Sequence, residues 1–218
     1  MRTRDNLTFG FIGIGLIGGS VAKALRRVYP SCKIIVFNRG AKPRVLAMND
    51  GTANIAVDSV NNTFSECDYI FLCTPVEKNV EYLKILKTII KDDCIITDVG
   101  SVKENIHKAV KILDMEKNFI GGHPMAGSEK TSYEHASDRL LENAYYPITP
   151  TDAVDNKYIE EYTQIVSDIG AIPIKIDYRE HDRVVAAISH LPHLIASSLV
   201  NLVKHNDSKL EYMKTFAA

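Results

Sequence analysis

His123 is the side chain in this sequence best placed to move a proton. It stands in the run Gly121-Gly122-His123-Pro124, directly after a short apolar segment. Oxidation of an alcohol by hydride removal must also remove the hydroxyl proton, and histidine is the usual acceptor because its pKa lies near neutrality. We therefore treat His123 as a candidate catalytic base. A packing role remains the alternative for any single histidine.

A second group of polar side chains lies in an apolar stretch near the C-terminal end of the sequence. On a helix, His190 and His193 share a face, and Ser189 and His193 are also neighbours. Zinc would need a third ligand, and the stretch has no carboxylate, so we expect anion binding or packing and no metal. The other histidines with polar neighbours are interpreted as surface residues: His107, His135 and His205.

A Gly-x-G-x-x-Gly pattern occupies residues 13–18 and predicts a dinucleotide site. It lies between a predicted strand and a predicted helix, which is the context that the motif requires. Gly13 permits a tight turn, Gly15 lets the backbone approach a pyrophosphate, and Gly18 lets the helix pack on the strand. The N–H groups at the start of the helix, at Leu16 and Ile17, would then face the phosphates. A glycine-rich turn without a ligand is the alternative.

The end of the second strand bears on the choice of cofactor. An NAD site usually has Asp or Glu there, to bond the ribose hydroxyls. This sequence has Asn38, which removes the charge that would repel a 2′-phosphate, and Arg39, which offers that phosphate a planar partner. We therefore favour NADP, with NAD possible if Arg39 only stacks on adenine. Thr74 and Pro75, at the next strand end, are also expected to line the cofactor site.

These side chains need a scaffold, and the sequence alternates short apolar runs with helical periodicity. The alternation predicts an α/β fold with a Rossmann-type, doubly wound parallel sheet. Strands are expected at 8–13, 33–37, 69–73, 94–97, 118–121, 144–148 and 171–174. Helices are expected at 16–28, 43–49, 80–90, 102–113 and 155–169. Ligands of such sheets bind at the carboxyl ends of the strands, where the candidate residues stand.

The pattern changes after residue 178 to one long helix over residues 181–205. Its apolar residues recur every three or four positions, and Pro192 is expected to kink it. We therefore expect a dinucleotide-binding domain at 1–178 and the start of an all-α domain at 179–218. The apolar face of the helix would pair with a partner subunit or cause aggregation.

Composition bounds the setting of the protein. The 218 residues carry a net charge of −1, with Lys and Arg dispersed, which argues against nucleic acid or an anionic membrane as partner. The four cysteines form no C-x-x-C pair and are expected to be reduced. Residues 2–24 imitate a signal peptide, but Asp5 and the glycines argue against one. No other stretch is expected to approach the length of a membrane span. We expect a cytoplasmic protein.

Five segments together resemble the prephenate dehydrogenases of tyrosine biosynthesis. The resemblance covers residues 8 to about 205 and depends most on the H-P-M-A-G-S-E run at 123–129 and the S-H-L-P-H run at 189–193. The other segments are the glycine pattern with Gly19-Ser20, the run 97–103, and His181-Asp182. The family oxidises prephenate to 4-hydroxyphenylpyruvate, with loss of CO2 and transfer of hydride to NAD or NADP.

The resemblance implies roles for particular residues. His123 would accept the proton of the ring hydroxyl, and Ser101 would orient His123 and touch both substrate and cofactor. His193, with Ser189, would hold the ring carboxylate, and Glu129 and Asp182 would lie at the pocket edge. The family also forms dimers through its C-terminal helical domain, so we expect a homodimer here.

One departure concerns the end of the sequence. The family continues with a glycine-rich stretch and an arginine motif that holds the side-chain carboxylate of the substrate. This sequence ends at Phe216-Ala217-Ala218, and Arg179 and Arg183 do not match that motif. We therefore expect most of the C-terminal helical domain to be missing; the alternatives are that another chain supplies the arginine or that prephenate binds weakly. Arogenate as substrate and a non-catalytic NADP-binding module stay open as alternatives. A β-hydroxyacid dehydrogenase is disfavoured, because the long helix offers only Lys204 as the lysine which that class uses.

Overall fold

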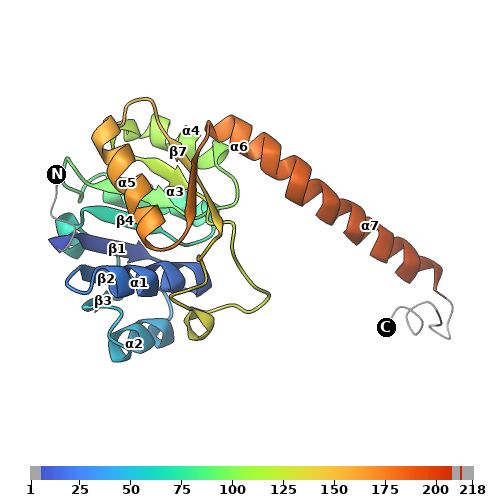
Figure 1. Cartoon of the computed structure of the whole chain (residues 1–218), viewed down its shortest axis with the longest axis horizontal. Helices are drawn as coiled ribbons and strands as arrows, with labels where there is room; N and C mark the ends of the chain where they lie inside the picture. Colours follow the sequence, from blue (N-terminus) through green and yellow to red (C-terminus); the bar gives the residue numbers. More distant parts are fainter. Residues whose placement is uncertain (1–5, 208–211, 213–218) are drawn as a thin grey trace.

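The fold is organised around a parallel β-sheet. The computed structural model describes residues 6–207 and Tyr212 (Figure 1). Five strands pair in the order β3-β2-β1-β4-β5, and all four pairings are parallel. Their bounds are Thr8–Ile12 for β1, Lys33–Phe37 for β2, Ile55–Val57 for β3, Tyr69–Leu72 for β4 and Ile95–Asp98 for β5.

A second, three-stranded sheet continues beyond β5. It has the order β6-β7-β8, with β6 at Ile120–Gly122, β7 at Tyr145–Pro150 and β8 at Ile172–Lys175. A parallel bridge between Ile96 and Phe119 joins the first sheet to the start of β6. The strand β7 runs antiparallel to β6 and parallel to β8, so the expectation of a purely parallel sheet holds for the first five strands only.

Helices cover both faces of the sheet, as a doubly wound fold requires. One buried cluster joins α1 (Leu16–Val28) and α5 (Asn156–Asp168) to the sheet, and the other joins α3 (Val76–Leu86) and α4 (Glu104–Ile112) to its opposite face. The helix α2 (Ala41–Asn49) leads to β3 at the edge. Short 3-10 turns lie at Asn62–Glu66, Glu116–Asn118 and Tyr133–His135.

The second strand shows why the sequence forms this sandwich. In β2 the side chains of Ile34 and Val36 enter one cluster, and those of Ile35 and Phe37 enter the other. Successive side chains of a strand point to opposite faces, so a strand covered on both sides must be apolar throughout. The continuous run Ile34 to Phe37 meets that need, and the sequence predicted β2 with its observed bounds.

After the sheet, the chain forms a long helical rod that extends away from the globular part (Figure 1). The rod consists of α6 (Tyr178–Val185), a π-helical turn (Ala186–His190) and α7 (Leu191–Asn206). Pro192 was expected to kink the helix, but the helix continues through it (Figure 1). Proline cannot donate the usual backbone hydrogen bond. The wider turn just before it, where the Leu191 N–H bonds to the Ala186 carbonyl, accommodates that loss.

The rod is more apolar than the sequence analysis allowed. The residues 178–206 form one helix that is long and apolar enough, by length and composition, to cross a membrane. The expectation that no such stretch exists was therefore wrong. No residue of α7 is buried, in contrast to the helices on the sheet. The end of the predicted helical region, at 208–211 and 213–218, lies outside the described residues.

Candidate active site

The glycine turn joins β1 to α1 at the carboxyl end of the first strand. Gly13 has φ +94°, a conformation that residues with a side chain rarely adopt, and a Cβ there would lie 2.7 Å from the Cys73 carbonyl oxygen. A Cβ on Gly18 would collide with the Gly13 carbonyl. These two glycines are therefore required by the close approach of β1, α1 and the end of β4.

Gly15 differs from its neighbours because a Cβ there would meet no atom within 4 Å. The space outside the Gly15 backbone is therefore open, and packing within the protein does not require a glycine at this position. Gly15 is also the residue before α1, and it gives that helix no side-chain cap. The first turn of the described helix, which includes Leu16 and Ile17, holds no acidic residue. A negatively charged pyrophosphate fits here, against free backbone N–H groups and the positive end of the helix.

Asn38 and Thr74 flank the glycine turn on its two sides. The Oδ1 atom of Asn38 accepts the N–H of Ile14 at 3.1 Å, so the side chain also holds the turn. Arg39 follows and is exposed. The Thr74 hydroxyl donates to Oδ1 of the buried Asn79 at 2.6 Å, and Pro75 precedes α3. The predicted cofactor residues thus lie at the carboxyl ends of β1, β2 and β4.

A buried ion pair ties β5 to β6 beneath the site. Lys103 and Asp98 are both fully buried, and their side chains form a salt bridge. The Lys103 ammonium also donates to the Gly122 carbonyl at 2.7 Å, and Asp98 accepts the N–H groups of Gly100 and Gly122. Burial lowers the pKa of Lys103, and the neighbouring Asp98 opposes that shift. This pair fixes the backbone of the residue before His123.

His123 projects from the carboxyl end of β6 and is partly buried. Its Nδ1 lies 2.9 Å from Nε2 of His181, and Nδ1 of His181 lies 2.7 Å from Oδ1 of Asp182. Burial, and then the neighbouring His181 and Lys103, lower the pKa of His123 to about 4. The ring is therefore neutral at physiological pH and able to accept a proton. In sheet order β6 lies three strands from β1, which is roughly 14 Å at a spacing of about 4.8 Å per strand.

The remaining predicted site residues occupy the rim of this edge. Ser101 is exposed just beyond β5, and Glu129 is exposed in the loop after His123. Ser189 and His193 are exposed on the rod and line an open hollow with His190, Leu194 and Ser197. The described partner of the His123 ring is His181, whereas the sequence predicted that Ser101 would orient it.

His107 was expected at the surface but is buried. Its ring stacks on Tyr178 at 4.3 Å between centroids, and its Nε2 lies 3.0 Å from the Thr149 hydroxyl. Burial lowers its pKa to about 4. Its polar neighbours Glu104, Asn105 and Lys108 are exposed on α4, which is why the sequence predicted an exposed His107. The contact with Tyr178 holds the first turn of α6 against α4.

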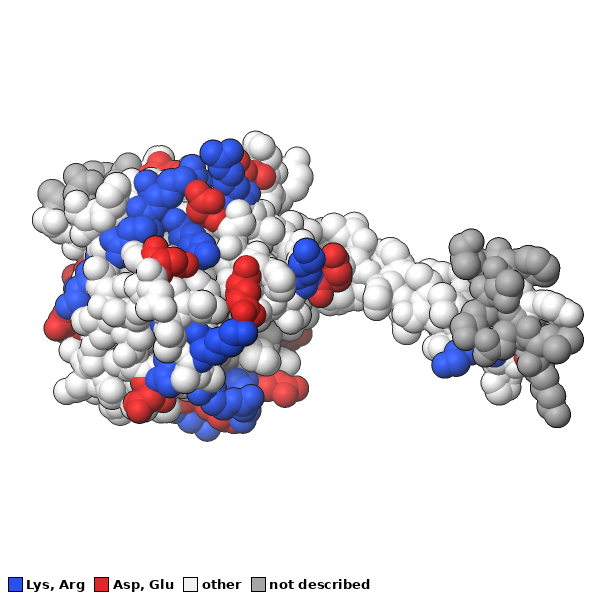
Figure 2. Space-filling model, turned by 90° about the horizontal axis from the view of Figure 1, so that it is seen from below, with Lys and Arg blue, Asp and Glu red and all other residues white. Residues whose placement is uncertain are grey.

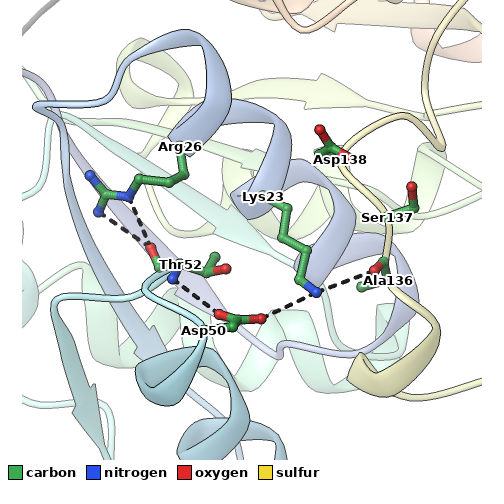
Figure 3. A pocket seen from close by; sticks show the side chains of 7 residues that line it. All are labelled: Lys23, Arg26, Asp50, Thr52, Ala136, Ser137 and Asp138. Atoms are coloured by element: carbon green, nitrogen blue, oxygen red, sulfur yellow. Dashed lines mark hydrogen bonds and ion pairs between the residues drawn. The ribbon is translucent and has the colours of Figure 1, made fainter.

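A polar hollow beside α1 anchors the loop that follows His123 (Figure 3). Lys23 reaches Asp50 at 3.2 Å and the Ala136 carbonyl at 3.3 Å, and the Tyr133 hydroxyl donates to Asp50 at 2.8 Å. Arg26 donates to the Thr52 carbonyl. The charged groups of the hollow are therefore occupied by partners within the chain. Its role is to tie residues 133–138 to α1 and to the end of α2.

Charge is distributed differently over the globular part and the rod. Figure 2 shows Lys and Arg interspersed with Asp and Glu over the globular part, whereas most of the rod is uncharged. The exposed large hydrophobic side chains of the described rod are aliphatic, and they include Leu191, Leu194, Ile195, Leu199 and Leu202. A surface of this kind is typical of an interface.

Comparison with known proteins assigns both parts of the chain. The model "Prephenate dehydrogenase, nucleotide-binding domain" matches residues 21–175, and "Prephenate dehydrogenase, dimerization domain" matches residues 177–218. The chain belongs to the prephenate dehydrogenase family. The resemblance noted in the sequence is thus confirmed, as is the Rossmann-type fold followed by a helical region.

Individual relatives within the prephenate dehydrogenase family agree. The prephenate dehydrogenase of Bacillus subtilis is 35% identical over 94% of this chain and 56% of its own length. The structure of Aquifex aeolicus prephenate dehydrogenase in complex with hydroxyphenyl propionate and NAD+ has a TM-score of 0.89 at 31% identity, over 95% of this chain and 73% of that one. Synechocystis arogenate dehydrogenase gives 0.85 at 29% identity, over 97% and 75%. The chain spans about half the length of the curated relatives it matches.

Sequence reasoning about this prephenate dehydrogenase family member missed two groups at the site. The Asp98–Lys103 pair lies in a run that the sequence analysis used only for its resemblance, and a lysine five residues from an aspartate gives no sign that both are buried. His181 was noted only as part of a motif. The adjacent pair His181-Asp182, placed at the start of a helix, was the signal that could have identified an orienting partner for His123.

Proposed function

We propose that this chain carries out the chemistry of its family, the oxidative decarboxylation of prephenate to 4-hydroxyphenylpyruvate in tyrosine biosynthesis. The observation that carries the proposal is the neutral, partly buried His123 at the carboxyl end of β6, on the same edge of the sheet as the open glycine turn. A base and a nucleotide cradle on one edge suit removal of a proton and a hydride from one carbinol.

The protein's own residues would act by position. The turn at Gly15 and the start of α1 would hold the pyrophosphate, and the bound nicotinamide would supply the hydride acceptor. His123 would accept the hydroxyl proton, and Ser101 on the adjacent strand end would contact the same hydroxyl. Because loss of CO2 makes the ring aromatic, the chain needs only to orient the substrate and withdraw one proton. Ser189 and His193, with Glu129 at the rim, would contact the substrate.

The proposed cofactor is NADP, with NAD as the alternative. Asn38 puts no negative charge beside a 2′-phosphate, and Arg39 is exposed directly after it. Lys42, the next cation, is paired with Glu134 at 2.6 Å, which leaves Arg39 better placed to meet a phosphate. The Aquifex aeolicus structure contains NAD+, which is why NAD stays the alternative here. We expect Arg39→Gln to raise the KM for NADP about tenfold, the value of one charge-assisted contact, and to leave the KM for NAD unchanged.

The proposed assembly is a homodimer through the rod, and the proposed location is the cytoplasm. The dimerization-domain match and the aliphatic surface of α7 support the first. The four free cysteines, three of them buried, support the second, since cytosolic proteins keep their thiols reduced. The proposed division into a dinucleotide-binding domain at 1–178 and a helical region from 179 is supported by the place where the chain leaves the sheet.

An absorbance assay of the reduced cofactor tests the proposed activity. The full chain is mixed with NADP+ or NAD+ and with prephenate or arogenate. We expect turnover of prephenate, and a fall of 10²- to 10⁴-fold in kcat for His123→Asn, the usual contribution of a general base. The matched control is His135→Asn, which changes an exposed histidine. Turnover of arogenate alone would reassign the substrate, and nucleotide binding without turnover would favour a non-catalytic module.

A further inference from the structure

The side chains of His123, His181 and Asp182 form a continuous hydrogen-bonded series. Nδ1 of His123 meets Nε2 of His181, and Nδ1 of His181 meets Asp182. The Asp182 carboxylate in turn accepts the backbone N–H groups of Lys103 at 2.8 Å and Glu104 at 2.9 Å. These amides stand at the start of α4, where the helix dipole favours a negative charge. The hydrogen-bonded series therefore ends at a fixed anion, the Asp182 carboxylate.

The anion at one end determines the direction of each hydrogen bond in this series. Burial disfavours the ionised form of Asp182, but hydrogen bonds from the Glu104 amide, the His181 ring and the Lys103 amide outweigh it and lower its pKa. An ionised carboxylate only accepts, so Nδ1 of His181 must donate. If His181 is neutral, its Nε2 carries no proton and must accept. Nδ1 of His123 then donates, and Nε2 of His123 keeps a free lone pair.

The His181 ring lies in the interior, with its side chain 1% exposed, and its two nitrogens meet His123 on one side and Asp182 on the other. The charged and titratable groups that act on His123, besides His181, are the buried Lys103, the partly buried Asp182 and the exposed His190. The Lys103 ammonium already supplies a buried positive charge at this place. A protonated His181 would donate to His123 from Nε2 and leave the proton of His123 on the wrong nitrogen for a base facing the substrate.

We propose that His181, fixed by Asp182, is a positioning residue that keeps the proton of His123 on Nδ1 and leaves its Nε2 free to take the substrate hydroxyl proton. The assignment rests on the proposed role of His123. Among the described residues, none forms a hydrogen bond with Nε2 of His123, in keeping with a lone pair kept for the substrate.

The position of His181 depends on the start of α6. The Asp177 side chain accepts the N–H groups of Arg179 and Glu180 and so caps the helix, and the His181 N–H bonds to the Asp177 carbonyl. His181 therefore lies in the first turn of the rod, whereas His123 and the amides that hold Asp182 belong to the sheet domain. The base is oriented only when the rod is docked on that domain. Through His181, the helical region is thus coupled to catalysis by a residue that does not itself touch the substrate, in addition to the substrate contacts proposed for Ser189 and His193.

Substitutions at 181 and 182 separate positioning from simple packing. A glutamine amide occupies the place of Nε2, so in His181→Gln its oxygen can still accept from His123. His181→Phe keeps the ring volume and removes the acceptor. We expect His181→Gln to retain kcat within about threefold, and His181→Phe to lose 10²-fold or more with little change in the KM for cofactor. In Asp182→Asn the amide group would donate to His181 and reverse both hydrogen bonds, and we expect a loss of the same size.

Nitrogen NMR of the histidine rings in the full chain measures the proposed state directly and needs no turnover. We expect His123 protonated on Nδ1 and bare on Nε2 in the wild type and in His181→Gln, and the opposite form in Asp182→Asn. The pH profile of kcat should shift in His181→Phe and stay in place in His181→Gln. A wild-type His123 protonated on Nε2, or a His181→Phe variant with wild-type kcat and pH profile, overturns the proposal. If prephenate is not turned over, the activity proposal fails alone, since the NMR result still decides the state of the ring.

Discussion

The carboxyl edge of the sheet and the helical rod differ in whether their side chains find interaction partners within the chain. At the edge, Asp98, Lys103, His181 and Asp182 have their hydrogen-bond partners inside the chain, and Gly15 leaves space where a nucleotide would enter. On α7 the aliphatic side chains are exposed, and no residue is buried. These polar groups of the edge are therefore satisfied within one chain, whereas the aliphatic face of the rod is left uncovered by the described residues. Substitutions in the edge should change the stability of a single chain, and those in the rod should change association.

The largest loss of stability is expected for Lys103→Met, which leaves the Asp98 carboxylate buried without its partner. Removing one member of a buried pair costs about 3–5 kcal/mol, because the other charge stays uncompensated. Urea denaturation followed by circular dichroism measures the free energy of unfolding. The control is Lys108→Met, since Lys108 forms an exposed ion pair with Glu104, and we expect a change below about 0.5 kcal/mol. Equal effects of the two variants would contradict the contrast between edge and surface.

The next effect is a loss of stability in mild acid. His107 and His123 have pKa values of about 4 in the folded chain against an ordinary value of 6.5, so the unfolded chain binds more protons between those values. The contribution of neutral histidines is fully present above pH 6.5 and is lost as the pH falls toward 4. Each should add a slope of about 1 kcal/mol per pH unit to the free energy of unfolding.

The matched variant for this slope is His107→Gln. Glutamine keeps a hydrogen bond to the Thr149 hydroxyl and does not titrate, so we expect a flatter acid limb in urea titrations at pH 4.5 to 6.5. His135→Gln, at an exposed histidine, should leave the limb unchanged. An unchanged limb in His107→Gln would mean that folding does not lower the pKa of His107.

A smaller and more selective effect is expected within the glycine turn. Gly18→Ala puts a methyl group against the Gly13 carbonyl and should cost about 1–3 kcal/mol, as overpacking does. Gly15→Ala meets no atom within 4 Å, so the unfolding free energy should be unchanged or slightly raised. It should nevertheless weaken nucleotide binding about tenfold or more in calorimetric titration. Unaltered binding in a folded Gly15→Ala variant would show that no ligand approaches this backbone.

The smallest effect on a single chain is expected in the rod. Leu199→Asp changes a side chain that is 57% exposed and should alter the unfolding free energy of the monomer by less than about 0.5 kcal/mol. It should abolish the self-association that we expect for the wild type in sedimentation, and Asn201→Asp, on a polar position of the same helix, should not. Binding of the wild type to phosphatidylcholine vesicles in flotation, with no self-association, would instead assign the apolar face to a lipid surface.

The sheet domain followed from the sequence because its signals are local. The helix α1 and the strand β2 have the predicted bounds. The strand is an uninterrupted apolar run and the helix begins directly after the glycine turn, so each is specified by its own residues. The strand β3 was missed because Ile55–Val57 has only three residues and is stabilised by pairing with β2. The reversal of β7 against β6 depends on the path of a long loop held by Lys23 and Tyr133, which no local pattern records.

The site was predicted in its parts and not in its connections. Glycines and His123 were found because their spacing and position at strand ends have chemical meaning. Burial of His107 and the pairing of Lys103 with Asp98 could not be found, since residue type predicts exposure for both. The link from His123 to His181 joins positions 58 residues apart, and only the packing of α6 on the sheet domain makes them neighbours.

Asn38 has a consequence for how this protein can evolve. One side chain both holds the Ile14 amide of the glycine turn and stands where the proposed cofactor choice is made. Few residues can replace it, because the turn needs a short side chain with an oxygen acceptor at that point. Aspartate meets that need, and its codons differ from those of asparagine by a single transition. A single nucleotide change could thus alter the proposed cofactor choice and still preserve the turn. Larger side chains at this position would disrupt the turn.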